Sequence, residues 1–324
     1  MRLCTFSTAD VASHVGLALA GDRVLDVTAS FAGDPRFATL LALIEHQDET
    51  LPALRKLQAQ GAKPGCAHPA HALRQVRLEV PYRPPQIRCF SVYEQHLKNA
   101  LQQVMAHGVR PATGMLMRAL GAGKVPKAFY ETPIYYKGVR LNLSGHGSKV
   151  RRPDPGAKLD YEAELGVIVG RPGKNIGTSA AMSHVFGYVI FNDFSERAQL
   201  MKEMRTRPSA GPAKGKDFDG SNSLGPWIVT ADEIRDPHAL GVTVRVNGEV
   251  RGEGSTAGMT HRIDRVVSYA SANETLHGGE LLATGCVPNC AGIEQWRFLD
   301  DGDRVDVEIA GLGVLTNSIT GHQP

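Results

Sequence analysis

One short segment restricts the fold of this chain more than any other, the run KLDYEAELGVIVG at residues 158–170. Its apolar residues predict a buried β-strand, and the side chains of a strand alternate between two faces. Asp160, Glu162 and Glu164 therefore point to one face, and the apolar residues between them point to the other. We expect a strand with a row of carboxylates along one side.

Such a row must be solvated, protonated or neutralised by a cation, because ionised groups that are buried without a partner are costly. Carboxylate oxygens are hard ligands, which suit Mg²⁺, Mn²⁺ or Ca²⁺. The next apolar run, GYVIFND, ends at Asp193, where a third carboxylate can meet Glu162 and Glu164. An exposed acidic edge, or ion pairs with lysines, is the alternative to a metal site.

A glycine-rich segment further on offers cations to the same region. In GPAKGKDFDG, Lys214 and Lys216 stand among glycines, which let the backbone approach closely and hold a cation near a bound anion. A solvated loop is the alternative for either lysine.

The charge balance favours a small molecule as partner. Among 324 residues, 36 Lys and Arg nearly balance 33 Asp and Glu, which argues against nucleic acid or a membrane surface. No run approaches the roughly 20 apolar residues of a membrane span, so we expect a soluble protein.

The 5 cysteines are few, which fits the cytoplasm. Cys286 and Cys290 lack a second pair or suitably spaced histidines, so a structural role is expected there instead of a zinc site.

The pattern of strands and helices predicts two domains. Residues 1–80 alternate short strands with helical runs, as in a small N-terminal α/β domain. The prolines of PYRPPQI mark a boundary, and residues 81–324 are β-rich. A helical pattern begins near Glu94 and ends at Gly108. Residues 94–147 are expected to form a lid. The predicted fold class is α+β, dominated by β-structure.

Four motifs in this order, LDYEAELGVIVG, YVIFNDFSER, GPAKGKDFDG and HGGELLATGC, make the chain resemble the fumarylacetoacetate hydrolase family over about residues 83–319. The resemblance implies a catalytic domain with a mixed β-sandwich roll. It also implies a divalent cation, Mg²⁺ or Mn²⁺ with Ca²⁺ as a further choice, and assembly as a homodimer. Residues 1–80 match only loosely, as the variable N-terminal domain of that family would.

The same resemblance implies a role for each candidate site residue. Glu162, Glu164 and Asp193 take the places of metal ligands. Lys216 takes the place of a lysine that contacts the substrate and its developing negative charge. His96, on the lid, takes the place of the histidine that activates water, and Glu294 that of the acid that orients this histidine. The places of substrate-binding residues are taken by Tyr136, Arg197 and Cys286.

Three features of the sequence depart from the family's pattern. Cys89 stands where members near the name-giving enzyme carry an aspartate as a fourth metal ligand, so we expect three carboxylates with waters completing the shell. Cys286 stands where a threonine hydroxyl would meet a substrate carboxylate. The segment SERAQL keeps Arg197 and displaces a glutamine. We expect these changes to alter substrate specificity more than metal binding.

The predicted function is metal-dependent hydrolysis of a carbon–carbon bond in an acylpyruvate or a related β-diketo acid. Lys216 and the divalent ion would stabilise the enolate that this cleavage leaves, and His96 would act as the general base. A 2-keto acid decarboxylase, isomerase or hydratase/dehydratase on the same site is the alternative. A reading from another class is a catalytically weak member that binds a ligand or serves as a structural partner.

Overall fold

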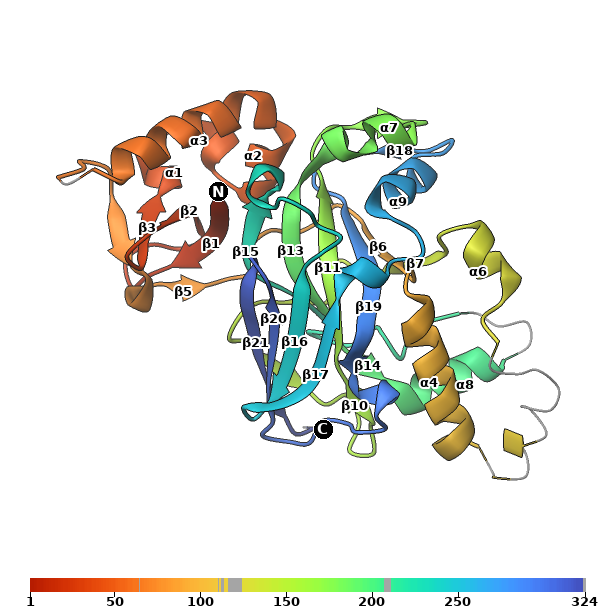
Figure 1. Cartoon of the computed structure of the whole chain (residues 1–324). Helices are drawn as coiled ribbons and strands as arrows, with labels where there is room; N and C mark the ends of the chain where they lie inside the picture. The colour runs from red at the N-terminus through yellow and green to blue at the C-terminus, as the bar shows by residue number, and fades with distance from the viewer. Residues whose placement is uncertain (64, 110, 112–113, 116–123, 207–210, 323–324) are drawn as a thin grey trace.

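The computed structural model describes residues 1–63, 65–109, 111, 114–115, 124–206 and 211–322. Its largest unit is a mixed sheet of 12 strands (Figure 1). Its main path runs, in spatial order, through β4 (Ala70–Ala72), β3 (Arg23–Asp26), β2 (His14–Leu19), β1 (Arg2–Ser7), β15 (Asn222–Thr230), β13 (Val185–Asp193), β11 (Glu162–Val169), β19 (Leu281–Ala291), β6 (Ile87–Phe90) and β7 (Tyr135–Gly138). Two short strands pair beside this path, β5 (Arg77–Leu78) with β1 and β8 (Leu143–Ser144) with β15.

A second sheet of 5 strands packs against the middle of the first. Its spatial order is β17 (Glu249–Ser255), β16 (Gly241–Val246), β20 (Arg304–Ile309), β21 (Gly313–Thr320) and β9 (Lys149–Arg151). Alternate residues of β16 and β20, such as Val244 and Val307, enter one hydrophobic core together with Leu165 and Ile190 of the large sheet. This period of two builds a sandwich. Two further pairs are β10 (Leu159–Asp160) with β14 (Ser195–Glu196), and β12 (Gly173–Lys174) with β18 (Thr275–Leu276).

Helices lie at the ends and edges of the sheets. The described helices are α1 (Val27–Ser30), α2 (Leu40–Glu45), α3 (Gln47–Gly61), α4 (Glu94–His107), α6 (Lys127–Glu131), α7 (Thr178–Ala181), α8 (Arg197–Arg205) and α9 (Ile263–Ala270). Apolar residues of α2 and α3, among them Leu43 and Leu54, share a second core with Val189 and Ile228 of the large sheet. The α4 and α8 helices lie together at the far end from this core (Figure 1).

The first residues of the chain extend the large sheet. Strand β1 pairs antiparallel with β15, with Leu3 opposite Ile228, so the strands of the N-terminal part continue the sheet that carries β11 and β13. The division of the chain near residue 80 stays a prediction.

The predicted fold class is confirmed, because the structure is β-dominated with mixed sheets and a few helices. The helix that begins at Glu94 is also confirmed. One strand over residues 158–170 was too simple a prediction, because β10 and β11 are separated at Tyr161. Helix α8 was not predicted; Glu196 caps it by accepting hydrogen bonds from the backbone of its first turn.

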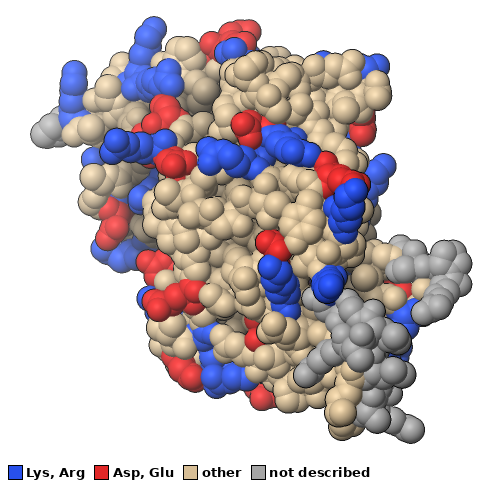
Figure 2. Space-filling model, turned by 45° about the vertical axis from the view of Figure 1, so that its right-hand side comes forward, with Lys and Arg blue, Asp and Glu red and all other residues tan. Residues whose placement is uncertain are grey.

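Within the described residues, no helix combines the length and the apolar character needed to cross a membrane. On the face in Figure 2, basic and acidic side chains are interspersed.

Candidate active site

The three predicted metal ligands come together in the large sheet. Because β11 and β13 are antiparallel, the start of β11, with Glu162 and Glu164, lies beside the end of β13, with Asp193. One carboxylate oxygen from each residue lies within 4.8 Å of the others. Glu164 and Asp193 are only 2% and 1% exposed. The alternation predicted from the sequence thus places three acids at one buried point.

Two buried cations reach this cluster. The Lys216 Nζ donates to Glu162 Oε2 at 2.6 Å and to Asp193 Oδ2 at 2.8 Å. The Arg197 guanidinium donates to Glu162 Oε1 at 2.6 Å. Tyr136 of β7 donates its hydroxyl to Asp193. Predicted as a substrate-binding residue, Arg197 is held by acids of the site; its role toward a substrate stays a prediction.

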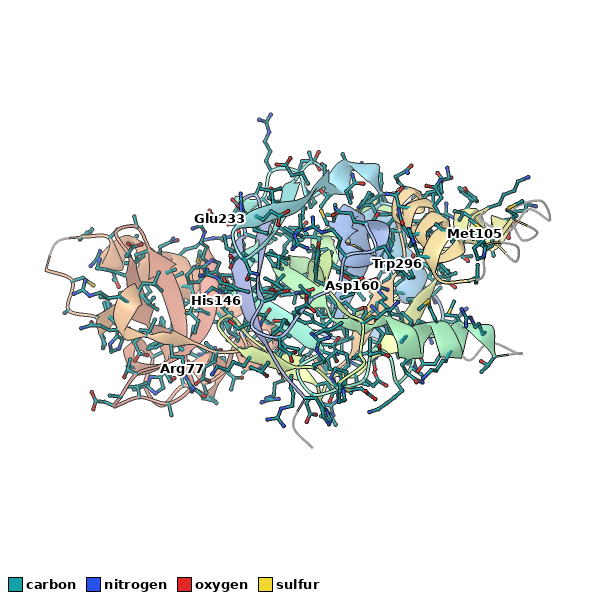
Figure 3. The ribbon with its side chains drawn as sticks, turned by 90° about the horizontal axis from the view of Figure 1, so that it is seen from below. Arg77, Met105, His146, Asp160, Glu233 and Trp296 are labelled. Atoms are coloured by element: carbon teal, nitrogen blue, oxygen red, sulfur yellow. The ribbon has the colours of Figure 1, made fainter. Side chains whose placement is uncertain are left out.

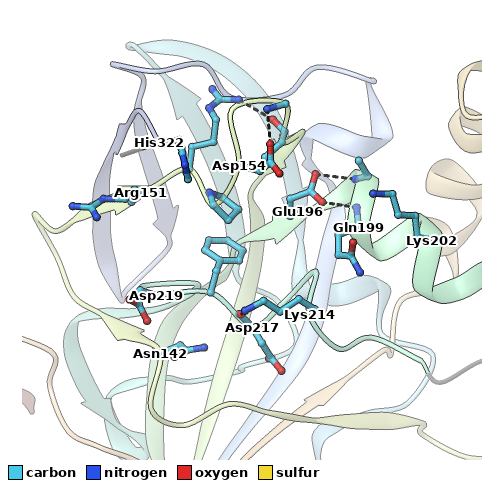
Figure 4. Close-up of a pocket in the computed structure, with 16 residues that line it drawn as sticks. Asn142, Arg151, Asp154, Glu196, Gln199, Lys202, Lys214, Asp217, Asp219 and His322 are labelled. Carbon is cyan, nitrogen blue, oxygen red and sulfur yellow. Dashed lines mark hydrogen bonds between the residues drawn. The ribbon is translucent and has the colours of Figure 1, made fainter. Parts of the chain in front are cut away.

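The glycine-rich pattern alone left open which of two lysines serves the site, and the resemblance assigned Lys216. The structure separates the two side chains. A Cβ at Gly215 would lie 2.7 Å from Leu200 N, so glycine lets this loop pack against α8 and turn Lys216 inward. Lys214 points elsewhere and donates to the carbonyl of Asp217 at 2.8 Å. It lines a separate hollow of about 650 Å³ together with Glu196 and Lys202 (Figure 4).

The three acids of the cluster differ in the direction of their pKa shifts. Burial raises the pKa of Glu164 well above its usual value, and the charges of Asp193 and Glu162 add to this effect. Burial also raises the pKa of Asp193, despite Lys216. At Glu162, burial is outweighed by the charges of Lys216 and Arg197, which hold its pKa well below the usual range. Burial therefore disfavours the ionised forms of Glu164 and Asp193, and a further cation at this point would favour them.

The residues present fit a hard divalent cation. All three candidate ligands offer carboxylate oxygens, which such ions prefer. Among the described residues, Asp193 Oδ1 has no hydrogen-bond partner although it is buried. Glu164 is oriented by a hydrogen bond from Gly285 N at 2.8 Å. Gly285 has φ +88°, and a Cβ there would lie 2.5 Å from Phe90 O, so only glycine fits this approach.

The predicted histidine and its acid lie beside the cluster. His96 is buried on α4, with Nδ1 3.3 Å from Glu294 Oε2 and Nε2 3.8 Å from Glu162 Oε1. Glu294 belongs to the 3₁₀ turn η6 (Gly292–Glu294) and also receives a hydrogen bond from Ala291 N at 3.2 Å. A possible base thus lies between its own acid and the carboxylate cluster.

Two residues that support this arrangement were given no role from the sequence. Asn99 Nδ2 donates to Glu294 Oε1 at 2.9 Å. Its position three residues after His96 places both on one face of α4, and this spacing could have indicated it. Asp160 accepts from Gly292 N at 2.7 Å, from Ile293 N at 2.9 Å and from Arg197 Nε at 2.7 Å. It lies in the middle of the molecule (Figure 3) and fixes η6 next to the metal-ligand strand.

The two cysteines that depart from the family's pattern are both buried. Burial raises the pKa of Cys89 well above its usual value, with the charges of Asp193 and Glu164 adding to the rise. Cys89 is not part of the group that Glu162, Glu164 and Asp193 form. Cys286 groups instead with His96 and Glu294, with ligand atoms within 4.8 Å of one another.

The chain is similar in sequence to known proteins. Residues 90–320 match the family model for the C-terminal domain of fumarylacetoacetate (FAA) hydrolase. A mitochondrial oxaloacetate tautomerase from Xenopus laevis is 36% identical over 191 residues, which are 58% of this chain and 58% of that protein. An oxaloacetate tautomerase from Bacillus subtilis (strain 168) is 27% identical over 313 residues, 94% of this chain and 95% of that protein. The chain therefore spans less than two thirds of the frog relative and nearly all of the bacterial one.

A solved structure shares the fold over the whole chain. The crystal structure of maleylpyruvate hydrolase from Sphingobium sp. SYK-6, in complex with manganese(II) ion and pyruvate, has a TM-score of 0.73 and 24% sequence identity, and the comparison covers 100% of both chains.

Proposed function

This chain belongs to the fumarylacetoacetate hydrolase family, and from that membership we propose that it hydrolyses a carbon–carbon bond of an acylpyruvate or a related β-diketo acid. We assign Glu162, Glu164 and Asp193 as ligands of Mg²⁺ or Mn²⁺. A homodimer in the cytoplasm is part of the same proposal.

The observation that carries this proposal is the position of His96. Its imidazole lies between Glu294 at 3.3 Å and Glu162 at 3.8 Å, so a base with its own acid adjoins the proposed metal ligands. Hydrolysis needs a group that takes a proton from water, and imidazole titrates near neutral pH.

In the proposed reaction, His96 accepts a proton from water as the water oxygen bonds to the acyl carbonyl carbon. The bond between this carbon and the adjacent methylene carbon then breaks, and its electron pair stays on the methylene as the enolate of the 2-keto product. His96 then gives the proton that it took from water to this carbon, which completes the reaction and restores the neutral imidazole. Lys216 stabilises the negative charge. A bound divalent ion supplies Lewis-acid polarisation of the keto-acid oxygens.

A second candidate function is keto–enol tautomerisation of oxaloacetate. The similarity to the Bacillus subtilis oxaloacetate tautomerase, at 27% identity over 94% of this chain, favours it. Tautomerisation also passes through an enolate, but it moves a proton without the attack of water. The same lysine and histidine can serve both reactions.

A substrate panel with the purified protein and Mg²⁺ or Mn²⁺ separates these functions. Hydrolysis of acetylpyruvate yields pyruvate and acetate, oxaloacetate decarboxylation yields CO₂, and tautomerisation removes the enol absorbance of oxaloacetate without CO₂. We expect hydrolysis to be the fastest metal-dependent reaction. Turnover of oxaloacetate enol alone would replace the first proposal by the second, and no metal-dependent turnover on any substrate would indicate a catalytically weak member.

Replacing His96 by glutamine is expected to lower acylpyruvate hydrolysis by about 10²-fold, because general-base catalysis contributes that much or more. The thermal shift on adding Mn²⁺ should remain, since His96 is not among the proposed metal ligands. His107→Gln is the matched control, because His107 lies exposed on the same helix and stacks on Trp296. Equal rates for the two variants would remove His96 from the mechanism.

Asn99→Leu is expected to lower kcat by about tenfold with little change in KM, because outer residues that orient a catalytic group typically contribute 10–100-fold. The variant loses the hydrogen bond to Glu294 and leaves the three proposed metal ligands in place. Steady-state kinetics against Gln102→Leu, an exposed position on the same helix, checks this. A rise in KM alone would contradict a positioning role.

A further inference from the structure

A second set of ligand atoms lies on the other side of the His96 imidazole. One nitrogen of His96, the Cys286 thiol sulfur and one Glu294 oxygen all lie within 4.8 Å of one another. They come from α4, β19 and η6, and the three residues are only 8%, 3% and 7% exposed. The sequence offered no zinc partner for Cys286, but the fold brings a histidine from a distant part of the chain to it.

Two of the three residues in this set, His96 and Cys286, have ligand atoms with few hydrogen bonds among the described residues. Among the described residues, the buried Nδ1 of His96 makes no hydrogen bond, although Glu294 Oε2 lies 3.3 Å away. The Cys286 sulfur has one weak contact at 3.4 Å, to the carbonyl of Val287 in its own strand. An unpartnered buried imidazole nitrogen beside a thiol and a carboxylate calls for a ligand.

We propose that His96, Cys286 and Glu294 form a binding site for a soft divalent cation of the zinc class. Zinc takes sulfur, imidazole and carboxylate donors, and three protein ligands with a water make a common open site. Bond lengths of about 2.0–2.3 Å place tetrahedral ligand atoms less than about 4 Å apart, so the three side chains need to close by only about 1 Å.

The surroundings of Glu294 suit this role. Its two oxygens receive hydrogen bonds from Asn99 Nδ2 at 2.9 Å and Ala291 N at 3.2 Å, and such outer contacts hold metal-binding carboxylates in place. The thiol distinguishes this site from the all-carboxylate group of Glu162, Glu164 and Asp193, because hard ions bind sulfur poorly. The two cations would flank one imidazole, whose Nε2 faces Glu162 at 3.8 Å.

Binding of Zn²⁺ at this site releases one proton and blocks the proposed base. Zn²⁺ replaces the thiol proton of Cys286, which leaves to solvent, and a zinc–sulfur bond forms. Once Nδ1 is ligated, the other ring nitrogen carries the remaining proton, so His96 cannot accept a proton from water. Zinc therefore inhibits hydrolysis; this consequence rests on the proposed function, whereas the binding itself does not.

The binding is tested with protein first saturated with Mg²⁺. Zn²⁺ is titrated by calorimetry, and Co²⁺ is used as a spectroscopic probe because a thiolate ligand gives it a near-ultraviolet charge-transfer absorption. The variants are Cys286→Ser and, as a matched control, the nearby buried Cys290→Ser, which lies outside the group. Thermal midpoints report whether each variant folds. Glu294→Gln, which preserves the side-chain shape, provides a second test of the same site.

We expect wild type and Cys290→Ser to bind Zn²⁺ and to show the thiolate absorption with Co²⁺. Cys286→Ser should lose the absorption, and both it and Glu294→Gln should bind Zn²⁺ at least about tenfold more weakly. No zinc binding by the Mg²⁺-saturated wild type, or an absorption that persists in Cys286→Ser, would overturn the site. Zinc binding without inhibition of turnover would leave the site standing and would instead contradict the role of His96 in the proposed function.

Discussion

Replacing Glu164 by glutamine is expected to abolish metal-dependent turnover while the protein remains folded. The metal-free protein already disfavours the ionised Glu164 carboxylate, because burial and the neighbouring charges of Asp193 and Glu162 raise its pKa. Glutamine keeps the shape and can still accept the hydrogen bond from Gly285. The free energy of unfolding without metal should therefore be unchanged or about 1 kcal/mol higher, since like charges no longer meet.

The same substitution removes one of three oxygen ligands that carry charge. Lewis-acid stabilisation by a bound ion is worth several kcal/mol, and a loss of about 4 kcal/mol corresponds to about 10³-fold in rate. We expect Mn²⁺ to raise the thermal midpoint of wild type and to leave that of Glu164→Gln unchanged, as measured by differential scanning fluorimetry.

Glu294→Gln serves as the matched control, because Glu294 is a buried acid near the site that is not among the proposed ligands of Mg²⁺ or Mn²⁺. The thermal midpoint of this variant should still rise on adding Mn²⁺. Its activity should fall, because His96 loses the acid that orients it. If Glu164→Gln keeps full metal content and turnover, the carboxylate cluster is not the metal site. If it unfolds without metal, the effect on activity says nothing of a ligand, and Asp193→Asn then takes its place as the test.

The carboxylate cluster was predictable from the sequence because it depends on local geometry. A period of two along residues 158–170 fixes which side chains share a face, and alternate residues from Leu159 to Val169 do enter one core. Asp193 ends the neighbouring apolar run, so antiparallel pairing of β11 and β13 is sufficient to bring it to Glu162 and Glu164. The motif resemblance supplied the places of His96 and Glu294, which no local pattern could connect.

Apart from Asn99, whose spacing from His96 could have indicated it, the supporting contacts were not predictable, because they join elements that are distant along the chain. In the sequence, Asp160 cannot be distinguished from Glu162 and Glu164. In the structure, its carboxylate oxygens accept hydrogen bonds from the backbone N of Gly292 and Ile293 in η6. The choice of Lys216 over Lys214 came from the motif resemblance alone, because it depends on how one loop packs against α8, which a run of glycines and lysines does not reveal. The grouping of Cys286 with His96 likewise requires β19 and α4 to pack together.

The acids of the site share two buried cations and form one ionic network with them. Asp160 and Glu162 share Arg197, and Glu162 and Asp193 share Lys216. Of the four acids Asp160, Glu162, Glu164 and Asp193, only Glu164 accepts no hydrogen bond from a lysine or an arginine of the described residues. A bound ion would supply positive charge next to Glu164.

Replacing Lys216 by methionine is expected to produce the opposite pattern to Glu164→Gln. Methionine fills the volume but leaves Glu162 and Asp193 buried without the ammonium group that bonds both. Breaking a buried ion pair from one side costs about 3 kcal/mol or more, so the metal-free variant should unfold at a lower temperature or denaturant concentration. Added Mn²⁺ should raise its thermal midpoint by more than it raises that of wild type, because the ion restores positive charge to the cluster.

Activity in the metal-loaded Lys216→Met protein should nevertheless be about 10²–10³-fold below wild type, because the charge that meets the enolate is gone. Lys214→Met is the matched control: the two lysines are separated by one residue, but Lys214 points away from the cluster and donates to Asp217 O. Denaturant unfolding with and without Mn²⁺, followed by steady-state rates on the best substrate, measures both effects. If the two lysine variants show the same stability and the same rate, Lys216 neither neutralises the buried acids nor stabilises the developing charge.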